Sequence, residues 1–477
     1  MRFLSPLRTV IVGVAVAAGA SYAAHAQSPA ASSGTAARAA DLITERDIRA
    51  HMEFLASDAL NGRGSGTRDE WITATYIGSM LHRYGVEPFG DAGGFVQQID
   101  LAPLVAVAAP VLRAGALRLT HGQDLIVQAL GQGSAVSGPL HRYQRGTPVP
   151  DGAVLLMPAD ATSREDRTAA NAAAMVLSPE TPQVRSRWDD AAGQLPATSP
   201  AALRLTPATR TTRVVLSAAA FDQVQAVPEG TTVTLDFTTQ PAADRMTHTW
   251  NALGKITGAD PARAGEVIVL SAHLDHIGAR QVPEGQDGIN NGADDDASGT
   301  IAVLALARAL AMGPRPARTI VFALFGSEER GGYGAGYFVD LPVVPLDHIV
   351  ADLQFEMLGR PDPLVPEHHL WLTGYERSDL GAELAKHGAL LVADPHPDQS
   401  FFTRSDNIRF ARRGVVAHTV SSFGLHTDYH RPSDEIGTID FAHMTDAIRS
   451  MLDPIRGLAD SAFRPEWVPG GCPAPCR

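Results

Sequence analysis

Cysteine is nearly absent from this sequence, which has only two, Cys472 and Cys476, both within the last six residues. A disulfide scaffold is therefore excluded, and the main body of the chain has no cysteine with which to bind a metal ion. A pairing of these two with each other in an oxidising compartment stays open. It would close too short a loop to add much stability.

An excess of positive charge is also lacking. The chain has 39 Lys and Arg residues against 52 Asp and Glu residues, which gives a formal net charge of -13 at pH 7. Nucleic acids and anionic membrane surfaces attract basic proteins, so we expect neither as a partner.

Long apolar runs are missing after the first twenty residues. The one near the start, Val10 to Gly19, follows Arg2 and Arg8 and precedes the small-residue pattern Ala24-His25-Ala26. This order is typical of a secretory signal peptide, and the run is short for a membrane anchor, which is the alternative. We predict cleavage near Ala26–Gln27 and a secreted or periplasmic mature protein with no membrane attachment.

The composition changes along the chain and predicts several parts. With 477 residues, 44% of them hydrophobic, the chain is long enough for two or three domains. Aromatic residues thin out over residues 106–245, where Pro, Ala and Thr rise and short β-like runs appear. We predict a signal peptide (1–26), the N-terminal part of a main domain (27–105), an inserted, mostly-β accessory domain (106–245), the rest of the main domain (246–465) and a tail (466–477).

The residues with the clearest chemical pattern lie between 271 and 300. The apolar run E-V-I-V-L at 266–270 predicts a strand buried on both faces, with His273 and Asp275 at or just past its carboxyl end. Asp294, Asp295 and Asp296 follow in N-N-G-A-D-D-D-A-S-G-T, just before a helix expected at about 300–312. Three adjacent carboxylates repel one another, and a bound dication would compensate them. Capping of the helix is the simpler alternative.

Three further buried strands end in potential ligands. The strand expected at 318–325 is followed by Glu328 and Glu329, the strand at 349–355 by Glu356, and the strand at 414–421 by a loop that contains His430. Parallel strands of an α/β fold bring their carboxyl ends to one edge of the sheet, so these side chains should meet. Imidazole and carboxylate ligands indicate Zn²⁺, with Mn²⁺ and Co²⁺ as alternatives.

At these positions the chain resembles the secreted co-catalytic zinc exopeptidases, a family that includes bacterial leucyl aminopeptidase, aminopeptidases S and Y, and the glutamate carboxypeptidase II group. The similar stretches are H-L-D-H, G-A-D-D-D-A-S-G, S-E-E, F-E-M-L-G-R and Y-H-R-P-S-D, in matching order through residues 250–460, with L-A-S-D-A-L-N-G-R at 55–63. The resemblance implies a mixed, mostly parallel sheet flanked by helices. Residues 106–245 resemble, more distantly, the protease-associated domain of the family.

The resemblance also implies a ligand set for two Zn²⁺ ions. Asp294 would bridge the two ions. One ion would be completed by His273 and Glu356, and the other by Glu329 and His430.

Further roles follow from the same resemblance. Asp275 would orient His273 from outside the ligand set, and Glu328 would be the general base. The Asp294–Asp295 peptide bond would be cis. His276, together with His418 and His426, would have a supporting role.

Two positions depart from the family pattern. Many members have Asp where this chain has Glu356, a change that keeps the charge and lengthens the side chain. Many members also have His where this chain has Asn407, which affects the shape of the pocket and not the ligand set.

We therefore expect a zinc-dependent exopeptidase that acts on peptides, first of all an aminopeptidase. A carboxypeptidase stays open because Arg280, Arg330, Arg360 and Arg404 lie near the motifs and could bind a free carboxylate. A glutaminyl-cyclase-like enzyme with one zinc ion and a non-catalytic binding protein on the same scaffold also stay open.

Overall fold

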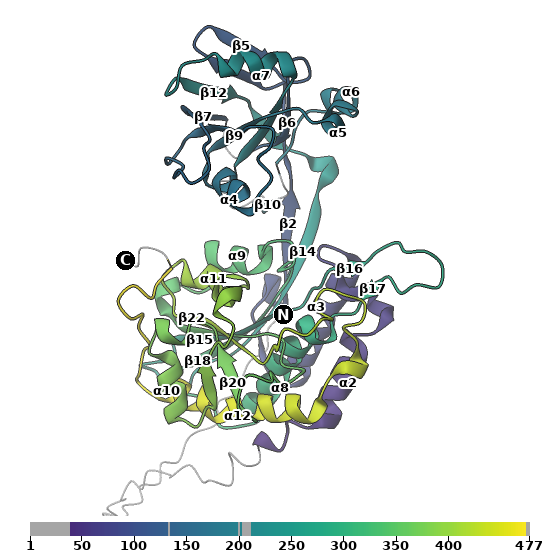
Figure 1. Ribbon diagram of the computed structural model, residues 1–477. Helices are drawn as coiled ribbons and strands as arrows, with labels where there is room; N and C mark the ends of the chain where they lie inside the picture. The colour runs from purple at the N-terminus through teal and green to yellow at the C-terminus, as the bar shows by residue number, and fades with distance from the viewer. Residues whose placement is uncertain (1–38, 132–133, 199–200, 203–210, 474–477) are drawn as a thin grey trace, which may run out of the picture.

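The structure is a computed structural model that describes residues 39–131, 134–198, 201–202 and 211–473. The predicted signal peptide and Cys476 lie outside these residues. Two bodies are visible, joined by a pair of long strands (Figure 1).

A mixed ten-stranded sheet forms the centre of the lower body (Figure 1). The four central strands, β18, β15, β19 and β22, are parallel to one another, whereas β14, β2 and β20 pair antiparallel on either side. The order is β10 (Ala201–Ala202), β2 (Val96–Ala102), β14 (Thr247–Ile256), β18 (Thr319–Phe325), β15 (Val267–His273), β19 (Ile349–Phe355), β22 (Ala417–Ser421), β20 (Leu370–Leu372) and β21 (Leu391–Ala393), with β1 (Glu87–Pro88) beside β14. This confirms the expected α/β fold with a mixed sheet, in which the four central strands and the edge pair β20–β21 are parallel and the other neighbours are antiparallel.

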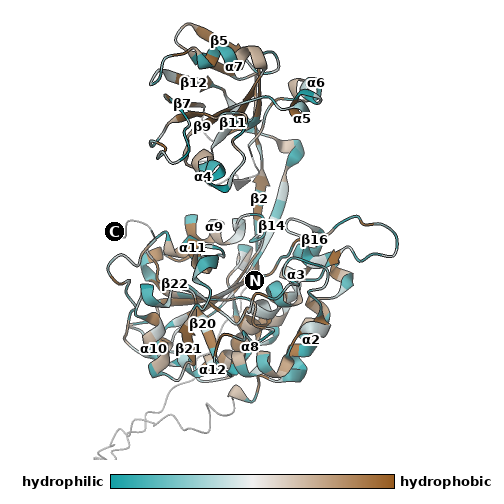
Figure 2. Ribbon diagram, in the orientation of Figure 1, coloured by the Kyte–Doolittle hydropathy of each residue, from teal (hydrophilic) through white to brown (hydrophobic). Residues whose placement is uncertain are grey.

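The central strands are mostly apolar because both of their faces are covered, and the polar side chains of β19, Asp352 and Gln354, are buried with hydrogen-bond partners. All seven residues of β15, β18 and β19 are buried, as the continuous runs of β-branched and aliphatic residues predict for strands between two layers of helices. Figure 2 shows hydrophobic colouring on β20, another strand whose residues are all buried.

Helices cover both faces of this sheet. One face packs against α2 (Glu45–Leu55), α3 (Arg68–Arg83), α8 (Gly299–Ala311) and α12 (Phe441–Asp460), with α10 (Leu380–Lys386) beside α12. The other face packs against α9 (Tyr333–Asp340) and α11 (Asn407–Ala411). Helix α8 is apolar nearly all round because it lies between the sheet and the outer helices α2, α3 and α12.

The upper body is built around a second sheet with a hydrophobic core of its own. It contains α4 (Arg164–Ala172), α5 (Pro182–Arg185), α6 (Trp188–Ala192) and α7 (Ala218–Gln225) as well as strands. Its strand order is β5 (Leu117–Thr120), β4 (Val111–Ala114), β12 (Thr232–Asp236), β7 (Ala135–Arg142), β8 (Val154–Leu156), β9 (Met175–Pro179), β11 (Thr212–Leu216) and β6 (Leu125–Ala129). The chain enters along β2 and returns along β14, and these neighbours are the long strands that join the two bodies (Figure 1).

Two small two-stranded sheets complete the topology. Strand β3 (Leu104–Ala106) pairs with β13 (Thr239–Pro241), at the base of the upper body. Strand β16 (Gly278–Ala279) pairs with β17 (Ile289–Asn290), between the two loops that carry the histidine and acidic motifs of residues 273–276 and 294–296.

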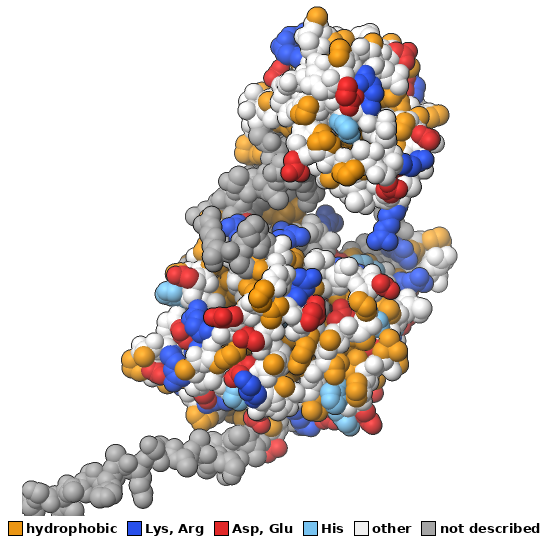
Figure 3. All heavy atoms as spheres, turned by 60° about the vertical axis from the view of Figure 1, so that its left-hand side comes forward, with side chains coloured by type: hydrophobic (Ala, Val, Ile, Leu, Met, Phe, Trp, Pro, Cys, Tyr) orange, Lys and Arg blue, Asp and Glu red, His pale blue; other side chains and the backbone are white. Residues whose placement is uncertain are grey.

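Within the part of the chain that the structure describes, no helix combines the length and the apolar composition needed to cross a bilayer. The face shown in Figure 3 carries acidic and basic side chains interspersed, without a large area of a single sign.

Candidate metal centre

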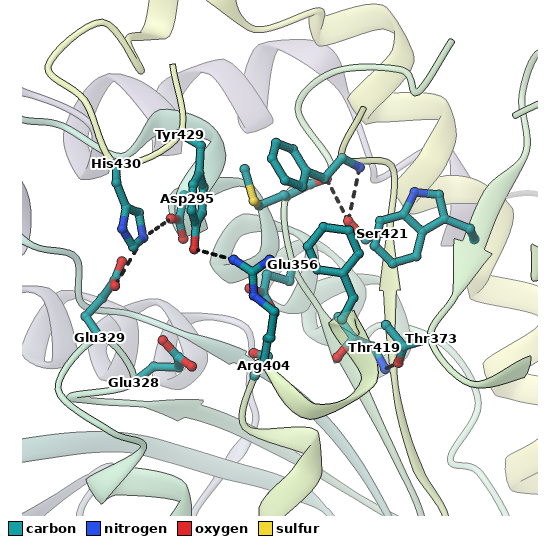
Figure 4. Close-up of a pocket in the computed structure, with 15 residues that line it drawn as sticks. Asp295, Glu328, Glu329, Glu356, Thr373, Arg404, Thr419, Ser421, Tyr429 and His430 are labelled. Carbon is teal, nitrogen blue, oxygen red and sulfur yellow. Dashed lines mark hydrogen bonds and ion pairs between the residues drawn. The ribbon is translucent and has the colours of Figure 1, made fainter. Parts of the chain in front are cut away.

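The carboxyl ends of β15, β18 and β19 and the loop after β22 meet at one edge of the large sheet. His273 is the last residue of β15, Glu328 and Glu329 follow β18, and Glu356 follows β19. His430, in the loop after β22, lies against the carboxylate of Glu329 (Figure 4). The sequence therefore placed these five side chains at the correct edge of the sheet.

Two groups of side chains have the composition and spacing of metal ligands. His273, Asp295 and Glu356 each offer an atom within 4.8 Å of the others, and so do His276, Asp295 and Glu329. Asp295 belongs to both groups. The structure thus contains two adjacent candidate metal sites that share one carboxylate.

The two oxygens of Asp295 face different partners. Its Oδ1 lies 3.2 Å from Nε2 of His273, and its Oδ2 lies 3.1 Å from Nε2 of His430. The same His430 nitrogen lies 3.2 Å from Oε2 of Glu329. The carboxylate of Asp295 therefore lies between the two candidate sites, where a bridging ligand would have to be.

Asp294, which we had expected in this position, lies elsewhere. Its Oδ1 accepts a hydrogen bond from the backbone N–H of Gly359 at 2.7 Å, and its Oδ2 lies 2.9 Å from Nε2 of His426. The shared carboxylate is one residue further along the chain, and the cis peptide bond is correspondingly Asp295–Asp296 and not Asp294–Asp295. Three consecutive aspartates have the same residue type at each position, so the sequence did not determine which one faces the cluster.

His276 lies nearer to the cluster than we expect for a residue with only a supporting role. Its side chain is fully buried, and Nδ1 lies 2.8 Å from Oε1 of Glu329 and 3.8 Å from Oδ2 of Asp295. His426 contacts Asp294, and His418 is bonded to Ser378 and Thr373 away from the cluster. The signal that could have identified His276 is its place in H-L-D-H, directly after Asp275.

Asp275 is buried beside His273 and Glu328. Nδ1 of His273 lies 3.2 Å from the backbone oxygen of Asp275 and 3.7 Å from its carboxylate. The carboxylate accepts hydrogen bonds from the backbone N–H of Glu328 at 3.0 Å and from the hydroxyl of Ser65. Asp275 thus contacts the histidine and fixes the loop that carries Glu328.

Two further buried aspartates, which the sequence analysis did not place in the ligand set, hold the turn at residues 293–298. Asp296 accepts the backbone N–H groups of His273, Gly299 and Met357 at 3.0–3.2 Å. Asp434, the last residue of Y-H-R-P-S-D, accepts those of Asp294 and Asp295 at 3.1 Å. Asp296 of the D-D-D motif therefore has a structural role, which is similar to the helix capping considered as the simpler alternative.

The acidic groups of the cluster perturb one another. Burial and the nearby negative charges raise the pKa of Glu328 well above its usual range, against the attraction of His273. Burial is also the main reason that the pKa of Glu356 rises to about 7. Burial would lower the pKa of His430, but its contacts with Asp295 and Glu329 raise it to about 10. Such perturbed groups are typical of functional sites.

A cavity with aromatic walls opens beside Glu328, Glu329 and Glu356. Phe401 stacks on Trp371 with ring centroids 5.5 Å apart. The guanidinium of Arg404 lies 4.9 Å from the centre of the Phe401 ring and donates to the hydroxyl of Tyr429 at 3.3 Å (Figure 4). The cavity also includes Met357, Phe423, Thr373, Thr419, Ser405 and Ser421.

The fold and this cluster define an α/β protein with a candidate two-metal centre at the carboxyl edge of its sheet. Residues 251–453 match the model of peptidase family M28. The matched segment, which is less than half of the chain, contains all of the candidate ligands.

Several known proteins are similar to part of this chain. A probable lipoprotein aminopeptidase, LpqL, of Mycobacterium tuberculosis is 33% identical over 118 residues, which are 24% of this chain and 22% of the relative. A probable leucine aminopeptidase 1 of Trichophyton verrucosum is 25% identical over 225 residues, 44% of this chain and 59% of the relative. The matched segments thus cover less than two thirds of either relative.

The fold is also found among solved structures. An aminopeptidase from Aneurinibacillus sp. strain AM-1 superposes with a TM-score of 0.51 at 18% identity, covering 90% of this chain and 97% of the other. At this identity the likeness shows the fold alone.

Proposed function

We propose that the protein is a zinc-dependent aminopeptidase that removes N-terminal residues from peptides, with two Zn²⁺ ions per chain. The observation that carries the proposal is the buried Asp295 carboxylate between two groups of imidazole and carboxylate ligands, in a segment that matches the model of peptidase family M28. The names of the relatives, which are aminopeptidases, support the same activity.

The spacing of the donor atoms supports zinc at both sites. Two ligand atoms at ordinary Zn–N and Zn–O distances are about 3.3 Å apart in a tetrahedral site. The three separations of 3.1–3.2 Å among Asp295, His273, His430 and Glu329 are close to this value. We assign His273, Asp295 and Glu356 to one ion, and Asp295, Glu329 and His430 to the other.

His276 fits better as a support for Glu329 than as a ligand. Its Nδ1 approaches the Glu329 oxygen to 2.8 Å, a hydrogen-bond distance, and this oxygen is not the one that faces His430. A hydrogen bond to the outer oxygen of a ligating carboxylate holds it in orientation.

Glu328 is the proposed general base. Bound zinc ions would polarise the peptide carbonyl and acidify a water molecule. Glu328 would take the proton of that water and then deliver it to the leaving amine. Its carboxylate lies apart from Glu329 on the same loop, at the border of the aromatic cavity (Figure 4). The raised pKa of Glu328 suits a group that must both accept and return a proton.

The aromatic cavity supports a preference for large apolar side chains at the substrate terminus. Trp371, Phe401 and Phe423 offer extensive apolar surface to such a side chain. Arg404 favours a second candidate, a carboxypeptidase, because its guanidinium lies at this cavity. Arg360 gives no such support, since it is paired with Asp428 and Asp434.

A substrate panel with a metal count tests the proposal. We expect hydrolysis of leucyl- and phenylalanyl-p-nitroanilide, loss of this activity when the N-terminus is blocked, and two zinc ions per chain by elemental analysis. Cleavage confined to peptides with a free C-terminus would establish the carboxypeptidase instead. One zinc ion with cyclisation of N-terminal glutamine would establish the cyclase-like enzyme, and a full ligand set without turnover would indicate a binding protein.

We also propose that residues 1–26 are a signal peptide and that residues 106–245 form the inserted domain. The separate core of the upper body supports the second statement. Mass spectrometry of the exported protein tests the first, since an intact N-terminus would contradict it.

A further inference from the structure

Arg63 is a buried arginine whose hydrogen bonds all go to backbone carbonyl groups. The residue is only 1% exposed. Nε donates to the carbonyl of Leu274 at 3.2 Å, and Nη2 donates to that of Gly292 at 3.0 Å. Nη1 donates to Asn291 at 2.6 Å and also to Leu55. One planar guanidinium therefore connects three separate segments of backbone.

Two of these segments carry the proposed ligands. Leu274 lies between His273 and Asp275, and Gly292 lies three residues before Asp295. The backbone adds a further link, because the N–H of His276 donates to the carbonyl of Arg63 itself at 3.1 Å. Arg63 thus joins the loop that carries His273 to the loop that carries Asp295.

The backbone that presents Arg63 is in an unfavourable conformation. Asn61, Gly62 and Arg63 have φ values of +44°, +70° and +48°, in the left-handed region that residues with a side chain rarely adopt. Such a conformation persists only where the surrounding contacts impose it, and it tends to occur at functional sites. Gly62 is required there, since a Cβ at this position would lie 2.2 Å from the carbonyl oxygen of Asn290.

Arg63 also lies in a strongly acidic environment. Asp275, Asp295, Asp296 and Asp434 all attract its charge. Among the described residues it nevertheless forms no hydrogen bond with a carboxylate. The acidic surroundings offset part of the cost of burying the guanidinium, while its donors remain directed at the two loops.

We propose that Arg63 is a positioning residue that sets the separation of His273 and Asp295, so that the metal centre is held in its binding geometry before a metal ion arrives. The inference rests on the proposed function as a zinc enzyme. The stretch L-A-S-D-A-L-N-G-R could also be explained as a simple turn. The inference instead connects it directly to the loops that carry the ligands.

Zinc affinity, measured by competition with a chromophoric chelator, tests the proposal without reference to activity. We expect Arg63→Met and Arg63→Lys to weaken zinc binding by about 10-fold or more, as other losses of support around a metal site do. Lysine keeps the charge, but its single nitrogen cannot reproduce the fork of the guanidinium, which here donates to four carbonyl groups.

Arg318→Met and Arg318→Lys are the matched controls. Arg318 is 0% exposed, precedes β18 at the opposite end of the strands, and donates to Glu266 and to the carbonyl of Leu458. These variants should lower the melting temperature of the metal-free protein while they leave zinc affinity unchanged. The Co²⁺-substituted protein gives a second readout, because a changed ligand geometry alters its visible absorption only in the Arg63 variants.

If the Arg63 variants do not fold, zinc binding by two glycine variants tests the proposal instead. Gly62→Ala pushes against Asn290 beside the ligand loop, whereas Gly85→Ala, at φ +80°, meets nothing within 4 Å. Only Gly62→Ala should weaken zinc binding. The inference is wrong if the wild type binds zinc and the folded Arg63 variants, or Gly62→Ala in their place, bind it equally well. A wild type that binds no zinc would overturn the proposed function, and this inference with it.

Discussion

The backbone N–H of Glu328 donates to the carboxylate of Asp275 at 3.0 Å. The strand end that presents His273 is thereby connected to the loop that presents the proposed general base. The preceding residue, Ser327, donates from its N–H to Glu70 of α3 at 2.8 Å. The loop after β18 is thus fixed from two sides, through the backbone of Ser327 and that of Glu328.

The two glutamates of this loop should behave differently when each is changed to glutamine. Glu328→Gln keeps size and hydrogen bonding but cannot accept the proton of water, so we expect kcat to fall by about two to four orders of magnitude. Its zinc content should not change. Steady-state kinetics together with elemental analysis checks both statements.

Glu329→Gln is the matched variant. It removes a charged ligand, so we expect weaker binding of one zinc ion, by about 10-fold or more, and partial recovery of activity in excess zinc. The two roles would be reversed if Glu328→Gln lost its zinc while Glu329→Gln kept its zinc and was inactive.

A second pair separates Asp295 from Asp294. Asp295→Asn removes the carboxylate shared by both groups, so we expect the loss of most bound zinc and of the activity. Asp294→Asn changes a side chain that is bonded to Gly359 and His426, so its main effect should be a lower melting temperature. Zinc content after dialysis against buffered zinc measures the difference, and equal losses in both variants would count against Asp295 as the shared ligand.

Without metal, the stability of the protein should decrease as the pH rises. The pKa of His430 is raised from 6.5 to about 10 and that of Glu356 from 4.5 to about 7. Each group therefore stabilises the folded state fully below its unfolded pKa and loses this contribution as the pH passes through its folded pKa. For Glu356 the loss falls between 4.5 and about 7, and for His430 between 6.5 and about 10.

The melting temperature with a chelator present should accordingly fall from about pH 6 to about pH 9. Zinc should oppose this fall, since its ligands must be deprotonated and fewer protons have to be displaced at high pH. His430→Asn should flatten the slope of the metal-free protein. A melting temperature that rises over this range in the chelated wild type would contradict the argument.

Arg404→Met distinguishes the two ends of a peptide substrate. If the protein is an aminopeptidase, kcat/KM on leucyl-p-nitroanilide, which has no carboxylate, should change little in this variant. The ratio of this value to kcat/KM on a long peptide should also stay the same. If Arg404 binds the terminal carboxylate, peptides with a free C-terminus should lose about 10-fold or more while their amides do not, the cost of a lost charged partner. Comparing each peptide with its amide gives this measurement.

Sequence patterns predicted the sheet edge well because the strands are buried on both faces. The runs before His273, Glu328 and Glu356 are mostly apolar. β18 and β19 end at the predicted residues, Phe325 and Phe355, whereas β15 continues three residues past the predicted run, to His273. The helix after the D-D-D motif was predicted for the same reason, as α8 is apolar throughout.

The loops were predicted less well because side-chain direction there does not follow a regular period. Alternation along a strand stops at His273, so strand periodicity did not indicate that His276 also faces the cluster. The same holds for Asp294 and Asp295, which differ in their surroundings and not in residue type. Arg63 was not identified at all, since its partners Leu274 and Asn291 lie 211 and 228 residues further along the chain.

That long separation has a consequence for biosynthesis. A ribosome makes Arg63 and the strand β2, then the whole upper body, and only later β14 and the two ligand loops. The upper body has its own core and can fold as a unit while synthesis continues. The metal centre cannot close until that unit has emerged and β14 has paired with β2, so a nascent chain stalled before about residue 300 should have a folded upper body and no peptidase activity.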